Sequence, residues 1–155
     1  MLILVTNNLY GISTPWEGQH GEERVADRGK AFGMPTVTID GNDAETTYLA
    51  IQKAMDYVRT ERKPYLLEAM VSRLRGHSSA SGANIAKDEI DCLEKFEATL
   101  EERQLMTRSQ MAQLRTQYTN ELAEASQRVK GEPAPTPESI WDHVFADKNY
   151  VAGES

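Results

Sequence analysis

Short runs of apolar residues alternate with polar segments in the first half of the chain, and this pattern predicts a parallel sheet. Residues 2–5 form an unbroken apolar run, which is typical of a strand buried on both faces. Residues 36–39 and 65–71 are also strand-like. Between them, apolar residues recur at helical spacing over residues 44–62. Two strands joined by a helix of this length form a βαβ unit, in which the strands are parallel.

The segments between these runs carry turn and helix-capping signals. Residues 12–21 contain proline and glycine and show no periodicity, so we expect a loop there. A short helix is predicted over residues 23–32, ending at Gly33. Residues 40–43 (DGND) should supply a turn and the N-cap of the helix that follows.

The second half of the chain has a helical pattern. Residues 76–86 are small and polar, and we expect an irregular, mobile loop there. A helix is predicted from about Asp88 to Met106, with four apolar side chains facing inward: Ile90, Leu93, Phe96 and Leu100. A second helix should begin after Thr107 and carry one apolar stripe, made of Met111, Leu114, Tyr118, Leu122 and Val129. A proline-rich linker near residues 131–137 leads to a last short helix that starts at Thr136 and Pro137.

These elements indicate an α/β fold, in which parallel strands with flanking helices are followed by a C-terminal helical tail. We expect residues 1–86 to form the α/β part and residues 87–155 to form the tail with its linker. The chain begins with a doubly buried strand, and only two further strands follow. We therefore expect the rest of the sheet to come from residues or chains beyond this sequence.

Composition and charge exclude several kinds of partner. The chain has 155 residues, a net charge of −7 and no basic patch that could neutralise phosphates, so a nucleic-acid partner is not expected. No apolar run approaches the length that spans a bilayer. Cys92 is the only cysteine, which excludes an internal disulfide and suits a reducing compartment. We expect a cytoplasmic protein, or a protein of the mitochondrial matrix if the source is a eukaryote.

The first group of residues with chemical potential is the sequence NNLYGIS, residues 7–13, which directly follows the first predicted strand. A hard divalent cation prefers oxygen ligands from carboxylates, amides and backbone carbonyls. In open α/β sheets, ligands gather at the carboxyl ends of the strands. An Asn-Asn pair is also common in turns. Taken alone, the motif is therefore more typical of a simple turn than of a cation site.

The second group is the sequence RLRGHS, residues 73–78, which comes just after the third predicted strand. It lies at a carboxyl end as well. His77 could act as a proton donor or acceptor there. The alternative is an exposed loop histidine beside two solvated arginines.

Together with the segments between them, these motifs resemble a known family. The stretches DRGKAFGMPTVTIDGND, KPYLLEAMVSR and ESIWDHVFAD keep the spacing of the alpha subunits of thiamine-diphosphate-dependent 2-oxo acid dehydrogenases. The resemblance covers essentially the whole chain, which looks like the C-terminal half of such a subunit. It implies part of the thiamine-diphosphate-binding fold, and thiamine diphosphate with Mg²⁺ as cofactors.

The resemblance also implies roles for individual residues. By match, the amide oxygen of Asn8 and the backbone carbonyl of Tyr10 would bind Mg²⁺, and Ile12 would contact the cofactor. His77 would lie over the cofactor and act on the substrate side. Arg73 would help to hold the loop and the active site.

The activity implied is the oxidative decarboxylation of a 2-oxo acid, with transfer of the acyl group to a lipoyl group. A branched-chain 2-oxo acid is the preferred substrate, and the alternative is the alpha subunit of a pyruvate or acetoin dehydrogenase. The implied partners are a beta subunit, or a beta domain of the same enzyme, and the lipoyl domain of the acyltransferase core.

The family's Gly-Asp-Gly segment, which carries the carboxylate ligand of Mg²⁺, should precede Asn7 by more residues than this sequence contains. We therefore expect the chain to be a fragment that is inactive in isolation, and to form a homo-oligomer through its uncovered edge strand. Another hypothesis is a non-catalytic structural or interaction module. A Rossmann protein without thiamine diphosphate is disfavoured, because the sequence has no G-x-G-x-x-G motif.

Overall fold

The computed structural model describes residues 1–77, 89–142 and 144. The chain forms two compact units, Met1–Arg108 and Ser109–Ser155. The predicted domain boundary between residues 86 and 87 lies outside the described residues, so that division stays a prediction.

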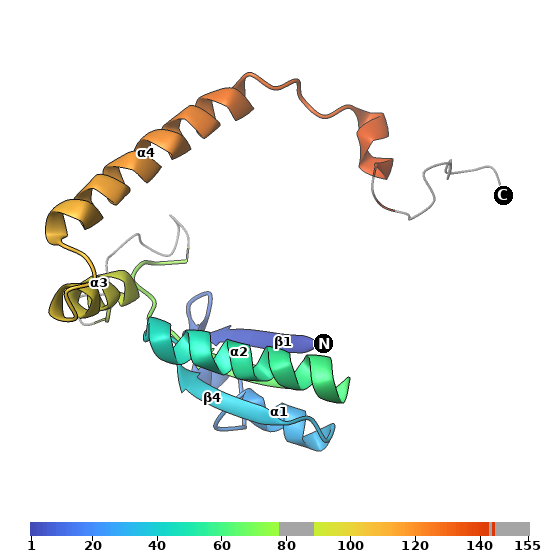
Figure 1. Ribbon diagram of the computed structural model, residues 1–155. Helices are drawn as coiled ribbons and strands as arrows, with labels where there is room; N and C mark the ends of the chain where they lie inside the picture. Colours follow the sequence, from blue (N-terminus) through green and yellow to red (C-terminus); the bar gives the residue numbers. More distant parts are fainter. Residues whose placement is uncertain (78–88, 143, 145–155) are drawn as a thin grey trace. The chain divides into compact units, whose positions relative to one another are not determined.

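The first unit is built on a three-stranded sheet in which all strands are parallel (Figure 1). Its strands are β1 (Leu2–Asn7), β4 (Thr36–Asp40) and β5 (Tyr65–Met70), in the spatial order β1-β5-β4. The predicted α/β class and the parallel strands are therefore confirmed. Within the register, Met70 lies opposite both Asn7 and Asp40, so the three strands end at the same level.

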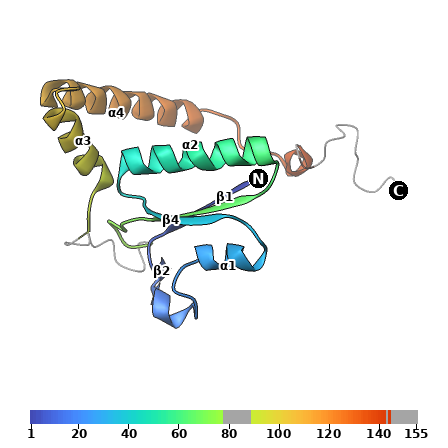
Figure 2. The same ribbon diagram turned by 60° about the horizontal axis from the view of Figure 1, so that its bottom comes forward.

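Helices cover both faces of this sheet (Figure 2). Helix α1 (Ala26–Ala31) packs against one face, and helix α2 (Ala44–Glu61) against the other. The predicted cap of α2 is confirmed, because the Asp43 carboxylate accepts a hydrogen bond of 2.8 Å from the Thr46 N–H. This bond is the largest of the effects that hold the pKa of Asp43 below its ordinary value. At its other end α2 stops at Arg62, which has a left-handed backbone with φ of 56°.

The centre of the core lies between β5 and α2. Leu67 and Ala54 are fully buried there, and Ala69 is almost so. Because β5 is the middle strand, its alternate residues are buried against opposite faces. On the face of α1, a Cβ added to Gly29 would lie 2.6 Å from the side chain of Thr36. The close approach of α1 to the sheet therefore requires glycine at that position.

The segment between β1 and α1 differs from the prediction. The loop predicted over residues 12–21 contains β3 (Thr14–Pro15), which pairs antiparallel with β2 (Tyr10–Gly11) just before it, and then a 3₁₀ turn, η1 (Trp16–Gly18). The predicted helix over residues 23–32 is confirmed only in its middle, since α1 begins at Ala26 and ends at Ala31.

Helix α3 (Cys92–Glu102) begins after Asp91, whose side chain accepts a hydrogen bond from the Leu93 N–H. The predicted start at Asp88 lies outside the described residues. The prediction that its apolar side chains face inward was wrong for three of the four: Ile90, Leu93 and Phe96 are exposed. Ion pairs instead join α3 to the end of β4 and to the start of α2: Lys95 to Asp40 and Asp43, and Arg103 to Glu45.

Helix α4 (Arg108–Lys130) leads into the second unit, which ends its described part with a 3₁₀ helix, η3 (Pro137–Trp141). The predicted helix start at Thr136 and Pro137 is confirmed, although the helix is 3₁₀ rather than α. On the predicted stripe of α4, Met111 is buried and the other four residues are exposed: Leu114, Tyr118, Leu122 and Val129.

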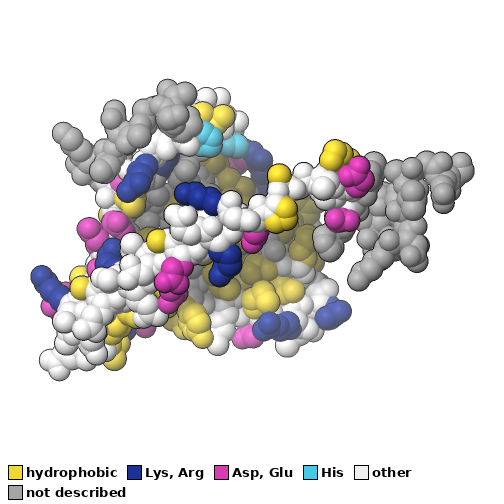
Figure 3. Space-filling model, turned by 90° about the horizontal axis from the view of Figure 1, so that it is seen from above, with side chains coloured by type: hydrophobic (Ala, Val, Ile, Leu, Met, Phe, Trp, Pro, Cys, Tyr) yellow, Lys and Arg dark blue, Asp and Glu magenta, His cyan; other side chains and the backbone are white. Residues whose placement is uncertain are grey.

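Acidic and basic side chains are interspersed on the face of the molecule shown in Figure 3. In the described part of the chain, no helix combines the length and the apolar character that crossing a membrane would need.

Candidate functional site

The carboxyl ends of the three parallel strands are joined by hydrogen bonds into one edge. The Val71 N–H donates to the Asn7 carbonyl at 2.9 Å, and the Gly41 N–H donates to the Met70 carbonyl at 2.7 Å. The amide oxygen of Asn42 accepts a bond of 2.9 Å from the Ser72 N–H. A Cβ at Gly41 would lie within 3 Å of Ala69 and Met70 at the end of β5 and of Val71 just after it, so this contact requires glycine.

The first motif forms a tight turn at this edge. The amide oxygen of Asn7 accepts a hydrogen bond of 2.9 Å from the Leu9 N–H, and that of Asn8 accepts one of 3.0 Å from the Tyr10 N–H. Leu9 and Ile12 have positive φ angles of 62° and 59°. The Asn-Asn pair therefore forms a turn, and whether it also binds a cation stays a prediction. Each amide oxygen has two lone pairs, so the turn leaves the Asn8 oxygen able to bind a cation as well.

Arg73 connects the second motif to this turn. Its guanidinium donates hydrogen bonds to the Ile12 carbonyl and, at 3.2 Å, to the Arg75 carbonyl. The same group lies 5.4 Å from the centre of the Tyr10 ring, at the distance of a cation–π contact. The structure therefore brings together four of the five predicted site residues: Asn8, Tyr10, Ile12 and Arg73.

The fifth predicted residue, His77, is exposed and directly precedes residues 78–88, which lie outside the described part of the chain. Within the described residues, the structure does not bring His77 into the network of Asn8 and Arg73. Most of the predicted loop over residues 76–86 likewise lies outside the described residues.

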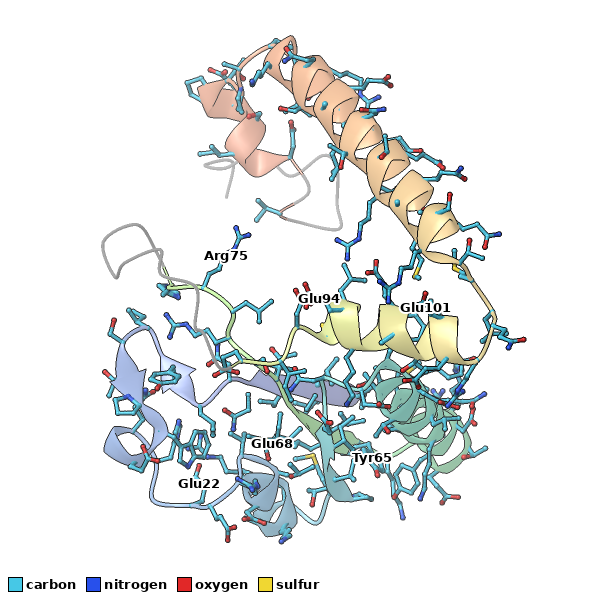
Figure 4. All side chains as sticks on the ribbon, turned by 90° about the vertical axis from the view of Figure 1, so that its left-hand side faces the viewer. Glu22, Tyr65, Glu68, Arg75, Glu94 and Glu101 are labelled. Atoms are coloured by element: carbon cyan, nitrogen blue, oxygen red, sulfur yellow. The ribbon has the colours of Figure 1, made fainter. Side chains whose placement is uncertain are left out.

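Glu68 is a candidate residue that the sequence analysis missed. It lies in the middle of β5, on the side of the sheet that faces α1, and its side chain is fully buried (Figure 4). Its carboxylate accepts four hydrogen bonds: from Asn7 Nδ2 at 2.7 Å, Val25 N at 3.2 Å, Ala26 N at 3.0 Å and Thr38 Oγ1 at 3.0 Å.

These bonds decide the charge of the buried carboxyl. Burial raises the pKa of Glu68, but the hydrogen bonds lower it by more, so its pKa lies below the ordinary value. The signal in the sequence was a glutamate within the apolar run YLLEAM of a predicted buried strand. A charged residue in such a place must be fully hydrogen-bonded, and the structure supplies those partners.

A small pocket of about 130 Å³ lies beside the carboxyl end of β1. Its lining includes Asn8, Tyr10 and the rings of Trp16 and His20, which are tilted by 33° and have their centres 4.0 Å apart. A larger groove of about 450 Å³ lies between α2 and α3. None of the predicted site residues lines that groove.

The donor chemistry at the turn fits part of a hard-cation site. The amide oxygen of Asn8 and the carbonyl of Tyr10 are neutral oxygen donors of the kind that Mg²⁺ accepts. Across residues 1–77 and 89–142, no three His, Cys, Asp or Glu side chains are grouped so that they could hold a metal ion.

The fold and this edge define a class: a parallel α/β protein whose strand ends present oxygen donors and an arginine-held turn. Comparison with known families then identifies the group. The family described as "Dehydrogenase E1 component" matches residues 1–138, and the chain belongs to this family, whose members depend on thiamine diphosphate. The predicted family is confirmed.

Curated relatives carry matching names. A 2-oxoisovalerate dehydrogenase subunit alpha from Bacillus subtilis is 29% identical over 154 residues, which cover 94% of this chain and 47% of that protein. The human mitochondrial 2-oxoisovalerate dehydrogenase subunit alpha is 28% identical, over 95% of this chain and 35% of that protein. A pyruvate dehydrogenase E1 component subunit alpha from Rhizobium meliloti is 24% identical, over 94% of this chain and 44% of that protein. The chain therefore spans less than half the length of these relatives.

Proposed function

We propose that this chain is the C-terminal half of the alpha subunit of a 2-oxo acid dehydrogenase that oxidatively decarboxylates a branched-chain 2-oxo acid. The observation that carries the proposal is the Asn8–Arg73 network at the carboxyl edge of the sheet, in a chain that matches the dehydrogenase family. The preference for a branched-chain substrate rests on the names of the Bacillus and human relatives.

In this proposal, Asn8 and Tyr10 give the amide oxygen and the backbone carbonyl to Mg²⁺, and Ile12 contacts the cofactor. When bound, thiamine diphosphate supplies the nucleophile and the electron sink for decarboxylation. Since both protein ligands named here are neutral, the charge of Mg²⁺ must be balanced by the diphosphate and by a carboxylate from outside the described residues.

Arg73 and His77 have different roles in this proposal. Arg73 holds the Ile12 carbonyl and the Tyr10 ring, so its guanidinium fixes the loop that follows β5 against the turn that carries the ligands. His77 stands on the substrate side, where an imidazole can give or take a proton at the reacting oxygen.

The proposed partners are a beta subunit, or a beta domain of the same enzyme, and the lipoyl domain that receives the acyl group. A homo-oligomer of the isolated chain stays a prediction, and one feature supports it. Among the described residues, β1 pairs with β5 alone, and Leu4 on this edge strand is exposed. The compartment, cytoplasm or mitochondrial matrix, also stays a prediction.

The proposal is tested by titrating Mg²⁺ and thiamine diphosphate into the isolated chain and into a complete assembly, in which the remainder of the alpha subunit and a beta subunit accompany it, while heat of binding is recorded. We expect saturable binding in the complete assembly and no decarboxylation by the isolated chain. An assembly that binds no cofactor would favour the hypothesis of a non-catalytic module. Turnover by the isolated chain would contradict its expected inactivity.

A second candidate substrate is pyruvate, which the name of the Rhizobium relative favours. The ratio of kcat/KM for 3-methyl-2-oxobutanoate and for pyruvate, measured in the complete assembly, separates the two. A ratio above one is expected, and a ratio below one would assign the chain to a pyruvate dehydrogenase.

A further inference from the structure

Glu68 ties three separate elements to the centre of the sheet. Its carboxylate binds the side chain of Asn7 at the end of β1, the hydroxyl of Thr38 in β4, and the two backbone N–H groups at the start of α1. A carboxylate has about four lone-pair positions, and all of them are occupied. The side chain is therefore satisfied without water, in a place where an unpaired charge would be strongly destabilising.

The contact with Asn7 continues into the turn. The amide nitrogen of Asn7 donates to Glu68 Oε1, while its amide oxygen accepts from the Leu9 N–H. Leu9 has a positive φ of 62°, which is unfavourable for a leucine and needs a compensating contact. The next two residues of the turn, Tyr10 and Gly11, form β2.

The direction of the Asn7 amide follows from the chemistry of Glu68. An ionised carboxylate only accepts hydrogen bonds, so the NH₂ group of Asn7 must point toward it. The amide oxygen is then left to face the Leu9 N–H. A neutral partner that both donates and accepts would not enforce this orientation.

We infer that Glu68 is a positioning residue, which sets the conformation of the Asn7–Ile12 turn through the Asn7 amide and so places the oxygens of Asn8 and Tyr10. The inference deepens the proposed function and rests on it for the role of these two oxygens. The conformation of the turn itself can be tested without any cofactor.

The test is a charge-exchange cycle in the full 155-residue chain, with hydrogen exchange of the Leu9 amide measured by NMR. Asn7→Asp keeps an oxygen acceptor for Leu9 but sets one carboxylate against another. Adding Glu68→Gln supplies an amide NH₂ group at position 68. This group must point at the carboxylate introduced by Asn7→Asp, because a carboxylate only accepts hydrogen bonds. Thr38→Val is the matched control, since it removes a different hydrogen bond to the same carboxylate.

Exchange of the Leu9 amide should be about tenfold to a hundredfold faster in Asn7→Asp, the range for a lost hydrogen bond to a charged group. It should return toward the wild-type rate in the double variant. In Thr38→Val, the exchange rate of the Leu9 amide should change by no more than that of the Leu67 amide. Leu67 lies in the central strand, so its exchange rate reports general destabilisation. An unchanged Leu9 amide in Asn7→Asp, or no recovery in the double variant, overturns the inference.

If Asn7→Asp does not fold, Asn7→Ser provides the same test. Its hydroxyl can still accept from the Leu9 N–H but is too short to reach Glu68. Faster exchange of the Leu9 amide in Asn7→Ser, relative to Leu67, supports the inference, and an unchanged ratio overturns it.

A second measurement connects the turn to the cofactor. In the complete assembly, Asn7→Ser adds no charge near the cation, and it should weaken the binding of Mg²⁺ and thiamine diphosphate by about tenfold, whereas Thr38→Val should not. Wild-type protein that takes up no cofactor contradicts the proposed function but leaves the exchange cycle valid. Normal uptake by wild type and Asn7→Ser alike contradicts the positioning role.

Discussion

Replacing Arg73 by lysine tests whether the turn and the loop after β5 act as one unit. The guanidinium makes three contacts at once: with the carbonyls of Ile12 and Arg75, and with the ring of Tyr10. A lysine keeps the positive charge, but its compact ammonium group on a flexible stem cannot span all three. The substitution therefore removes contacts that depend on the shape of the guanidinium while the positive charge is kept.

The expected loss of cofactor affinity in Arg73→Lys can be estimated from the contacts that the substitution removes. One hydrogen bond contributes about 1 kcal/mol net, and a cation–π contact at a partly exposed site contributes about 0.5–1 kcal/mol. If the turn must be ordered before Mg²⁺ and thiamine diphosphate bind, a loss of about 1.5–2 kcal/mol weakens the affinity roughly 10- to 30-fold.

The assay is calorimetric titration of Mg²⁺ and thiamine diphosphate into the complete assembly. Arg75→Lys is the matched control, because Arg75 is in the same segment, is exposed and extends away from the sheet (Figure 4). Only its backbone carbonyl contacts Arg73, and that group survives the substitution. Equal affinities for wild type and Arg73→Lys, or equal losses in Arg73→Lys and Arg75→Lys, would refute the reasoning.

Three further results are expected. Asn8→Ala should weaken Mg²⁺-dependent cofactor binding strongly in the complete assembly, whereas His77→Ala should leave binding near normal and lower kcat; the reverse pattern would exchange the two proposed roles. Leu67→Ala, which empties a fully buried site, should lower the free energy of unfolding in urea by about 2–5 kcal/mol, while Leu49→Ala at an exposed position of α2 should change it by less than about 0.5 kcal/mol. Because the folded pKa of Glu68 is lowered, its stabilisation is complete above the ordinary glutamate pKa and is lost as the pH falls through the folded value. Urea titrations between pH 7 and pH 3 should therefore show a steeper loss in wild type than in Glu68→Gln, and parallel curves would exclude this contribution.

The sheet and its central helix could be predicted because their signals are local. The apolar runs of β1, β4 and β5 and the Asp43 cap of α2 lie in consecutive residues, and the structure differs from the predicted ends of these elements by at most two residues. The pair β2–β3 could not be predicted in the same way. It depends on positive φ angles at Leu9 and Ile12, and neither residue type favours that conformation.

Helix α3 shows a second limit of sequence patterns. Periodicity identified the residues that share one face of this helix, but it could not tell whether anything covers that face. Leu93 and Phe96 share that face and are both exposed, while the attachment of α3 to α2 comes from polar pairs such as Arg103 with Glu45. A pattern of apolar residues therefore predicts a surface that is suited to burial, not burial itself.

Some residues of the site could likewise be predicted from motifs, whereas others could be found only from the structure. Asn8, Tyr10, Ile12 and Arg73 were identified through resemblance, and they meet because parallel strands bring their carboxyl ends to one edge. The contact between Asn7 and Glu68 joins residues 61 positions apart, in a register that no local pattern contains.

The two asparagines of the motif illustrate why that contact matters. Side chains along a strand alternate between its faces, so consecutive residues at the end of β1 cannot have the same surroundings. Asn7 is buried and bound to Glu68, whereas Asn8 is only partly buried and bonded within the turn. The motif therefore needs two amides for different physical reasons. One must donate into the sheet and accept from the turn, and the other must keep an oxygen available at the edge. A substitution at Asn7 should consequently act on the shape of the turn, and a substitution at Asn8 on the ligand itself.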